Sequence, residues 1–471
     1  MFDTLIANGT VVTADHSFKA DIGIKDGRIA AIGSDLGAAT EVVDAAGKLL
    51  LPGGVDVHTH LDSPVHDFFS ADDFETGTIA AACGGTTTII DFVQQAPGQS
   101  LSDAIATWDK KAIGKASIDY GYHIIITDMT DAVFEELATL PERGIPSFKI
   151  FMAYKGAQMV DDLTLIRALW QARESGALVM VHAENGDAAY FLQKQFLAAG
   201  KTAPKYHAET RPPRVEAEAT ARAIALAEIV DAPVFVVHLT CEEALEEVIR
   251  GKERGVEVLA ETCIQYLHAT KDDLARPGFE GAKFVFTPPA RTAHDHEVLW
   301  SGLADGVLEN VSSDHAAAMF KGGKDHAGTE DFTLIPNGGP GIEERMMMFW
   351  RGVREGRISQ EKFVELTATR PAKVFGLYPR KGALEVGADA DIVLWDPEAQ
   401  FTIANDRLHH NVDFTNYDGQ AVHGAPDTVL LRGVRVVEGR DWVGEVGAGV
   451  FLPRDRFQRQ AVPRSIVDAA E

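Results

Sequence analysis

The sequence predicts an α/β protein, a (β/α)₈ barrel to which both ends of the chain add a small β-sandwich domain. Eight apolar runs rich in β-branched residues recur through the middle of the chain, and each is followed by a helix-like segment. Continuous apolar runs suit strands that are buried on both faces, and alternation of strands with helices is typical of a parallel sheet. The two ends of the chain instead carry short strand patterns separated by turn signals.

The eight runs are the predicted barrel strands, and eight such units predict a closed barrel over residues 54–378. An open doubly wound sheet is the alternative, but no GxGxxG turn supports a dinucleotide-binding fold. The runs are VDVHTH (55–60), TTTIIDF (86–92), YGYHIII (120–126), SFKIFM (147–152), LVMVHAEN (178–185), PVFVVHL (233–239), VEVLAET (256–262) and VLENVSSDH (307–315).

The predicted sandwich domain takes residues 1–53 and 379–471. In the first part, short apolar runs are separated by Asn8-Gly9, Asp26-Gly27 and Gly53-Gly54, which are hairpin and turn signals. A similar pattern returns in GALEVGADADIVLWDP and TVLLRGVRVVEGRDWV. Neither half has enough strands to bury a core alone, so we expect the halves to form one domain.

Composition narrows the class of protein. The 471 residues are 45% apolar and 24% charged, with a formal net charge of −26, which argues against nucleic-acid or anionic-membrane partners because both require a positive surface. No apolar run approaches the roughly 20 residues of a membrane span, and the start lacks a secretory pattern, so we expect a cytoplasmic protein. Three cysteines without a CxxC pair predict neither a disulfide framework nor a thiolate zinc site.

Polar residues stand at the ends of several predicted strands. The first strand ends in His58-Thr59-His60, and the fourth carries Lys149; the other strand-end residues of this kind are His182, His238 and Asp314. An unpaired buried polar group costs about 1–3 kcal/mol, so these residues need a reason to be there. All lie near the carboxyl ends of their strands, the face on which barrel active sites form.

The strand-end residues together predict a metal centre. His58 and His60 are two positions apart, so they point to the same side of a strand, and His182 and His238 offer a second imidazole pair. With Asp314, these donors suit zinc or a similar ion better than calcium or magnesium. A single strand-end histidine is as readily a hydrogen-bonded core residue; the HxH pair and the matching strand ends favour metal binding.

Lys149 allows two interpretations. A buried lysine has a lowered pKa, and its neutral amine can react with carbon dioxide to give a carbamate that would bridge two metal ions. Alternatively, Lys149 pairs with a carboxylate. Considered alone, the residue favours the carboxylate pair.

Motifs along nearly the whole chain resemble the cyclic amidohydrolases, specifically the D-hydantoinase and dihydropyrimidinase group. HxH alone would be a weak signal, but with FKIFMAY and SSDH in order it is specific. The resemblance implies a binuclear zinc site on a TIM-type barrel, a flanking β-sandwich and a homotetramer. The motifs are GGVDVHTHLD, CGGTTTIIDF, SFKIFMAYKG, MVHAENGD, VVHLTCEEA, VSSDH, IPNGGPGIEER and ATRPAKVFGLYPRKG.

The resemblance also implies a role for each matching residue. His58, His60 and Asp314 would hold one metal ion, His182 and His238 the second, and Lys149, modified to N6-carboxylysine, would bridge both. Tyr154 matches the tyrosine that stabilises the developing oxyanion. Asn337 and Thr287 match residues that bind the ring amide through the main chain; the family often has serine where this chain has Thr287.

The implied reaction is hydrolytic ring opening of small cyclic amides, 5-substituted hydantoins or dihydropyrimidines, to N-carbamoyl amino acids. Two metal ions sharing a water molecule lower its pKa toward about 7 and so supply hydroxide, while Asp314 would transfer the proton to the ring nitrogen. Alternatives are an allantoinase- or dihydroorotase-like cyclic amidase and, from a different class, a non-catalytic assembly homologue.

Two departures from the family pattern concern the range of substrates. Ala316-Ala317-Ala318 replaces larger or polar residues after the SSDH motif, and the segment 61–70 differs at Pro64, His66 and Asp67. That segment corresponds to a loop over the substrate's side chain. His66 could be a further ligand or an acid–base group, but an exposed loop histidine is the simpler interpretation.

Overall fold

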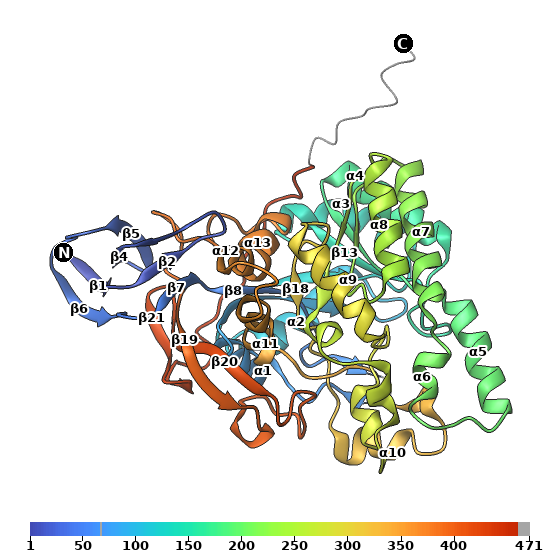
Figure 1. Ribbon diagram of the computed structural model, residues 1–471. Coiled ribbons are helices and arrows are strands. Elements are labelled where there is room, and N and C mark those ends of the chain that lie inside the picture. Colours follow the sequence, from blue (N-terminus) through green and yellow to red (C-terminus); the bar gives the residue numbers. More distant parts are fainter. Residues whose placement is uncertain (66–67, 460–471) are drawn as a thin grey trace.

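The computed structural model describes residues 1–65 and 68–459 (Figure 1). Its centre is a seven-stranded parallel sheet in the order β16-β15-β14-β13-β12-β11-β8. Seven of the eight predicted barrel strands therefore lie side by side, each within a few residues of its predicted range. Their bounds are β8 Gly54–Thr59, β11 Thr86–Gln94, β12 Asp119–Ile125, β13 Ser147–Phe151, β14 Leu178–His182, β15 Val234–Val236 and β16 Val258–Ala260.

The eighth predicted strand forms a separate two-stranded ladder. It is reduced to β18 (Val311–Ser312), which pairs in parallel with β17 (Thr262–Cys263). The seventh predicted strand is thus divided at Glu261: its first part pairs with β15 and its last residues pair with β18. A parallel bridge joins Thr59 to His315, which lies just beyond β18.

Both faces of the parallel sheet are buried, as the continuous apolar runs predict. Along β8, Val55 and Val57 belong to one core cluster with Phe92 from the adjacent β11 and Phe235 from β15. Alternate residues such as Val179 belong to a second cluster shared with the surrounding helices. Because side chains alternate along a strand, both sets must be apolar. The green and yellow helices of Figure 1 lie on the outside of this sheet.

Two further sheets are built from the ends of the chain. One contains only N-terminal strands, in the order β5-β4-β1-β6, and the other mixes both ends, in the order β22-β21-β20-β19-β7-β2-β3. Asp26-Gly27 joins β4 to β5 as a two-residue hairpin, as predicted. The remaining bounds are β1 Phe2–Ala7, β2 Thr10–Val12, β3 Ser17–Lys19, β4 Asp21–Lys25, β5 Arg28–Gly33, β6 Ala39–Asp44, β7 Leu49–Pro52, β9 Pro64–Val65, β10 Phe68–Phe69, β19 Ile392–Thr402, β20 Ala421–Leu431, β21 Val434–Glu438 and β22 Asp441–Trp442.

Helices follow most of the parallel strands, and several begin at a side-chain cap, as at Ser100 before α2 and Asp161 before α4. No helix in the described part of the chain combines the length and the apolar character needed to cross a membrane. The helices are α1 Phe74–Cys83, α2 Leu101–Ala112, α3 Asp131–Thr139, α4 Asp162–Ser175, α5 Gly186–Ala198, α6 Tyr206–Glu209, α7 Pro213–Ile229, α8 Glu242–Glu253, α9 Ala293–Ala304, α10 Asp325–Ala327, α11 Glu344–Arg354, α12 Gln360–Val364 and α13 Arg370–Val374.

Candidate metal centre

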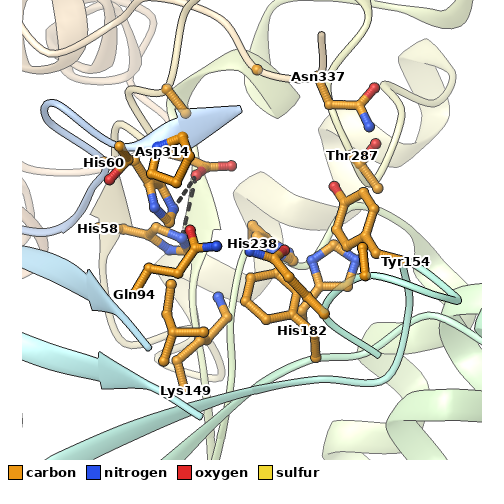
Figure 2. Close-up of a pocket in the computed structure, with 18 residues that line it drawn as sticks. His58, His60, Gln94, Lys149, Tyr154, His182, His238, Thr287, Asp314 and Asn337 are labelled. Atoms are coloured by element: carbon orange, nitrogen blue, oxygen red, sulfur yellow. Dashed lines mark ion pairs between the residues drawn. The ribbon is translucent and has the colours of Figure 1, made fainter. Parts of the chain in front are cut away.

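A cavity of about 250 Å³ opens at the carboxyl ends of the parallel strands (Figure 2). Its walls bring together every site residue that the sequence predicts, although these residues come from points as far apart as the first strand and the segment after β18. The nine residues are His58, His60, Lys149, Tyr154, His182, His238, Thr287, Asp314 and Asn337. Figure 2 shows His58, His60 and Asp314 at the left, Lys149 below, and Thr287 and Asn337 at the upper right.

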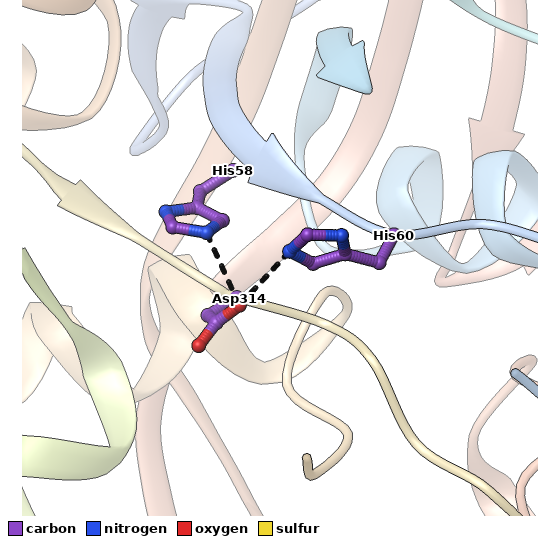
Figure 3. A group of neighbouring side chains, drawn as sticks. All are labelled: His58, His60 and Asp314. Atoms are coloured by element: carbon purple, nitrogen blue, oxygen red, sulfur yellow. Dashed lines mark ion pairs between the residues drawn. The ribbon is translucent and has the colours of Figure 1, made fainter. Parts of the chain in front are cut away.

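His58, His60 and Asp314 form a compact group of three donors (Figure 3). Oδ1 of Asp314 lies 3.3 Å from Nε2 of His58 and 3.5 Å from Nε2 of His60. Burial raises the pKa of Asp314, but the two imidazoles outweigh burial, so the net pKa is lowered and the carboxylate is the stable form. A carboxylate and two imidazole nitrogens facing one point suit a divalent transition-metal ion.

Glu261 determines which nitrogen of His58 faces the cavity. Oε1 of Glu261 lies 2.6 Å from Nδ1 of His58, and its other oxygen accepts hydrogen bonds from Asn310 and Ser312. Burial, helped by the Lys149 charge, lowers the pKa of His58 well below its usual value. A neutral imidazole that donates its Nδ1 proton to Glu261 keeps the Nε2 lone pair for a metal ion. Cys263 also lies near this pair, but burial raises the pKa of its thiol, which disfavours the thiolate.

Glu184 orients His182, one member of the second histidine pair, in the same way. Oε2 of Glu184 lies 2.8 Å from Nε2 of His182, which leaves Nδ1 of His182 as the free ring nitrogen. The ring centroids of His182 and His238 are 4.6 Å apart. Among the described residues, no carboxylate or thiol completes a three-donor group with this pair. A second metal ion would therefore need a further donor in the cavity.

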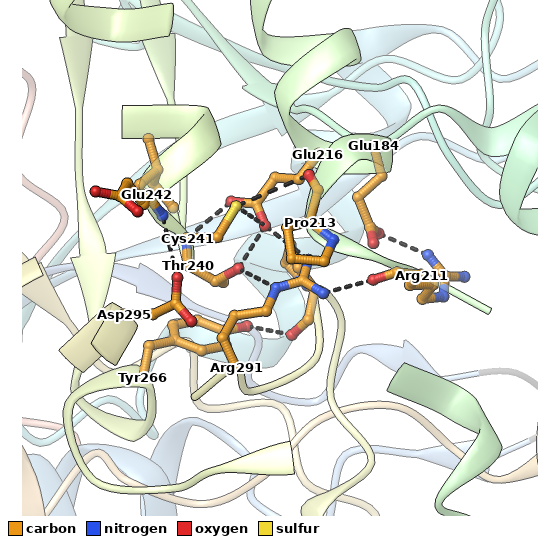
Figure 4. Close-up of polar contacts among 12 residues, drawn as sticks. Glu184, Arg211, Pro213, Glu216, Thr240, Cys241, Glu242, Tyr266, Arg291 and Asp295 are labelled. Atoms are coloured by element: carbon orange, nitrogen blue, oxygen red, sulfur yellow. Dashed lines mark hydrogen bonds and ion pairs between the residues drawn. The ribbon is translucent and has the colours of Figure 1, made fainter. Parts of the chain in front are cut away.

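A buried hydrogen-bond network that includes Arg211 and Arg291 holds Glu184 in place (Figure 4). Nη1 of Arg211 donates to Glu184 at 2.6 Å, and the Arg211 carbonyl accepts from Nη1 of Arg291 at 2.5 Å. Arg291 also donates to Glu216, on α7, and to Thr240, which lies two residues after His238. Buried groups that satisfy one another rigidify their surroundings, so this network stabilises the segments carrying both histidines.

Lys149 is a buried lysine whose amine lacks a hydrogen-bond partner. It is fully buried, its Nζ has no hydrogen-bond partner, and the rings of Phe92 and Phe151 lie 4.9 and 5.2 Å away. Burial lowers the pKa of Lys149. Figure 2 shows its amine pointing toward the gap between the two histidine pairs. The carboxylate partner that the residue alone favours is thus absent at hydrogen-bonding distance among the described residues.

Three cavity residues adopt left-handed backbone angles that are uncommon for their side chains. φ is +66° at Tyr154, +40° at His238 and +49° at Asp314. Such conformations cost about 1–3 kcal/mol each and persist where the surrounding structure enforces them, often at functional sites. Burial raises the pKa of Tyr154 to about 12, so its hydroxyl remains a proton donor to a ligand at neutral pH.

Several cavity residues were missed by sequence reasoning. Gln94, at the end of β11, lines the cavity, and Glu184 and Glu261 support the histidines. Both acidic residues lie inside the predicted strand runs, close to their ends, so the same strand-end argument would have found them. Ala316 also lines the cavity. His66 lies outside the described residues.

Comparisons with known proteins show which family the chain resembles along its length. Residues 49–436 match the model of the amidohydrolase family. The chain is 60% identical to a D-hydantoinase of Ralstonia pickettii over 97% of this chain and 100% of that protein. A solved D-hydantoinase structure covers the same shares at 60% identity with a TM-score of 0.96. A dihydropyrimidinase structure from Brevibacillus agri also has a TM-score of 0.96, at 51% identity over 97% of this chain and 100% of that one.

Proposed function

The chain belongs to the amidohydrolase family, and we propose that it opens cyclic amide rings, hydantoins and dihydropyrimidines, to N-carbamoyl amino acids. The observation that carries the proposal is the gathering of His58, His60 and Asp314 at the floor of a small cavity in a chain 60% identical to a D-hydantoinase. That relative also makes the D-enantiomer of a 5-substituted hydantoin the expected substrate.

We propose that the cavity holds two divalent metal ions, with zinc as the expected metal. His58, His60 and Asp314 would hold one ion, and His182 and His238 the other. The residues fit such a pair, since Glu261 and Glu184 each occupy one nitrogen of a histidine and leave the other toward the cavity. The ions would supply an acidified water and a positive charge for the substrate carbonyl.

Carboxylation of Lys149 is the proposed source of the missing donor. The amine is buried without a hydrogen-bond partner, between a three-donor group and a pair of histidines that lacks a third donor. Reaction with carbon dioxide forms an N–C bond, releases a proton and converts the amine to an anionic carbamate. Its two oxygens would provide one donor to each metal ion.

The remaining steps belong to side chains and main-chain groups of this chain. Oδ of Asp314 would accept a proton from the attacking water and deliver it to the leaving ring nitrogen. The Tyr154 hydroxyl would donate to the carbonyl oxygen as negative charge develops there. Main-chain groups of Thr287 and Asn337, on the opposite wall, would hold the ring amide in place.

The cavity favours neutral rings over acidic ones. An acidic substituent calls for an arginine that can form paired hydrogen bonds with it, and no arginine is present among the described residues that line the cavity. This observation makes a dihydroorotase-like activity the weaker alternative. A non-catalytic role is also weaker, since five of the six proposed ligand positions carry histidine or aspartate and the sixth, Lys149, would become a ligand on carboxylation.

We also propose that β17 and β18 complete a closed (β/α)₈ barrel over residues 54–378. The amide of His60 donates to the carbonyl of His315 at 2.9 Å, and the amide of Glu309 donates to the carbonyl of Ala260 at 2.8 Å. These bonds join the last strand to the first and seventh. The two terminal sheets would form the sandwich domain (1–53 and 379–471), whose first part would end just after β7.

We expect the protein to form a homotetramer, which sedimentation velocity tests.

A substrate panel on metal-loaded protein tests the proposed function. Purified protein is assayed with D- and L-5-substituted hydantoins, dihydrouracil, allantoin and dihydroorotate, and bound metal is measured by elemental analysis. We expect turnover of hydantoins or dihydrouracil, about two metal ions per chain, and loss of turnover with a chelator that is restored by zinc. Metal-loaded protein that opens none of the rings would refute the proposal, and turnover of dihydroorotate alone would favour the alternative.

A further inference from the structure

Lys324 is a buried cation outside the metal centre whose hydrogen bonds go only to main-chain carbonyls. It ends the helical turn η5 (Phe320–Lys324), and its side chain is fully buried. Nζ donates to the carbonyl of Pro336 at 2.6 Å and to the carbonyl of Val285 at 3.1 Å. Burial lowers the pKa of Lys324 to about 7; charged or neutral, the amine keeps enough N–H groups for both bonds.

The two carbonyls belong to the two segments that carry the proposed main-chain contacts to the ring. Val285 lies two residues before Thr287, and Pro336 immediately precedes Asn337. The segments are also joined directly, because the amide of Gly338 donates to the same Val285 carbonyl at 3.0 Å. Lys324 therefore bridges the segments at the point where they meet.

The carbonyls of Phe286 and Pro288, on either side of Thr287, also have hydrogen-bond partners. Nε2 of His207 lies 3.0 Å from the carbonyl of Phe286, and the hydroxyl of Tyr266 donates to the carbonyl of Pro288 at 2.8 Å. Within the described part of the chain, the carbonyl of Thr287 and the main-chain N–H and C=O of Asn337 have no hydrogen-bond partner, and both residues line the cavity. These main-chain groups therefore remain available to a ligand in the cavity.

We infer that Lys324 is a positioning residue for substrate binding: its two hydrogen bonds fix the segments 285–288 and 336–338 so that the main-chain groups of Thr287 and Asn337 face the ring amide. The inference rests on the proposed function and extends it to a residue that does not touch substrate. Burying an amine without a carboxylate is unfavourable, and an apolar side chain would fill the same space. The two carbonyls explain why a lysine is there.

Substitution Lys324→Met keeps a similar volume and removes both donors. We expect KM for hydantoin and dihydrouracil to rise about tenfold or more, since the ring would meet displaced main-chain groups, while kcat changes less than about threefold. Metal content per chain should equal that of the wild type. Amide hydrogen exchange in substrate-free protein should be faster in peptides covering 284–289 and 335–340.

Lys252→Met is the control, because Lys252 lies on the outer helix α8 and its Nζ also donates to a main-chain carbonyl, that of Val307, as well as to the carboxylate of Glu309 at 3.3 Å. It should leave KM and exchange in both peptides unchanged. A wild type that opens no ring would refute the proposed function. An active wild type with a folded, metal-loaded Lys324→Met variant of unchanged KM would overturn the Lys324 inference alone. If that variant does not fold, the milder Lys324→Gln is measured, and failure of both to fold would assign Lys324 to the fold and overturn the inference.

Discussion

The two ends of the parallel sheet contain buried lysines in opposite surroundings. Near the amino end, Nζ of Lys381 lies 2.6 Å from Asp119, the first residue of β12, 2.8 Å from Asp391 and 3.1 Å from Asp389. Toward the carboxyl end, Nζ of Lys149 has no hydrogen-bond partner. Both side chains are almost fully buried.

The different surroundings move the two pKa values in opposite directions. Burial lowers the pKa of Lys381, but its three carboxylates outweigh burial and the net pKa is raised. At Lys149 burial is the largest influence and the pKa is lowered. The comparison teaches that the carboxylates around Lys381 satisfy its charge and stabilise the fold, whereas the amine of Lys149 is left without a hydrogen-bond partner and is available to a ligand. Substitutions at each end of the sheet test this contrast.

The largest effect is expected at Lys149. Lys149→Ala removes the proposed bridging carbamate, so bound metal should fall below two ions per chain and kcat/KM should fall by at least about 10³-fold. The fold should remain, because no hydrogen bond is lost. Elemental analysis and steady-state kinetics measure the two quantities. Partial recovery of activity with a short carboxylate such as propionate would support the carbamate; full metal content and activity without it would contradict the proposed bridge.

Lys381→Met should lower the stability of the fold and leave metal binding and catalysis unchanged. Removing one partner of a buried ion cluster leaves uncompensated carboxylates, which typically costs about 3–5 kcal/mol of unfolding free energy. We expect a lower urea midpoint, while metal content and kcat/KM of the folded protein stay within about twofold. Lys48→Met, at a more exposed pair with Asp396, is the control and should cost less than about 1 kcal/mol. If the Lys381→Met variant lost bound metal while its unfolding free energy stayed unchanged, the contrast between the two ends of the sheet would be refuted.

This contrast also explains what the sequence could predict. Strand-end histidines and Asp314 stand out because they interrupt apolar runs, so their meeting in one cavity could be expected from the sequence. The proposed roles of Lys149 and Tyr154 came only from the family resemblance. The cluster around Lys381 could not be expected, because Asp119 and Asp391 look like ordinary residues at the ends of strands. Their pairing depends on how the terminal strands meet the parallel sheet, which is a long-range contact without a local pattern.

The fold, like the site, could be predicted only where the sequence carries a local pattern. Seven parallel strands follow from their apolar runs, but the division of the seventh predicted strand at Glu261 does not. At the division, the side chain of Glu261 contacts His58, which lies on another strand and carries no local signal for the change of partner. Lys324 was missed for a similar reason, since its partners are main-chain carbonyls, which carry no residue-specific signal in a sequence.

Tyr154→Phe should separate chemistry from metal binding at the carboxyl end. The ring and its packing remain, so metal content should not change, while loss of one donor to the developing oxyanion typically costs about 10²–10³ in kcat. The pKa of Tyr154, raised to about 12 by burial, implies that this contribution is constant from pH 6 to 9. A kcat equal to that of the wild type would remove Tyr154 from the mechanism.

The smallest of these effects is expected at Glu261, which touches the site only through His58. Glu261→Gln keeps the shape but replaces a carboxylate that can fix the Nδ1 proton with an amide that can also donate. His58 would then present Nε2 less reliably and with lower basicity, and such substitutions typically weaken metal affinity by about 10–100-fold. Competition with a chromophoric chelator measures this change, with Glu297→Gln, at a surface pair with Arg357, as the control. Equal affinity in both variants would mean that the orientation of His58 is determined by its packing against Phe92, whose ring centroid is 4.8 Å away, and that the carboxylate is not needed for it.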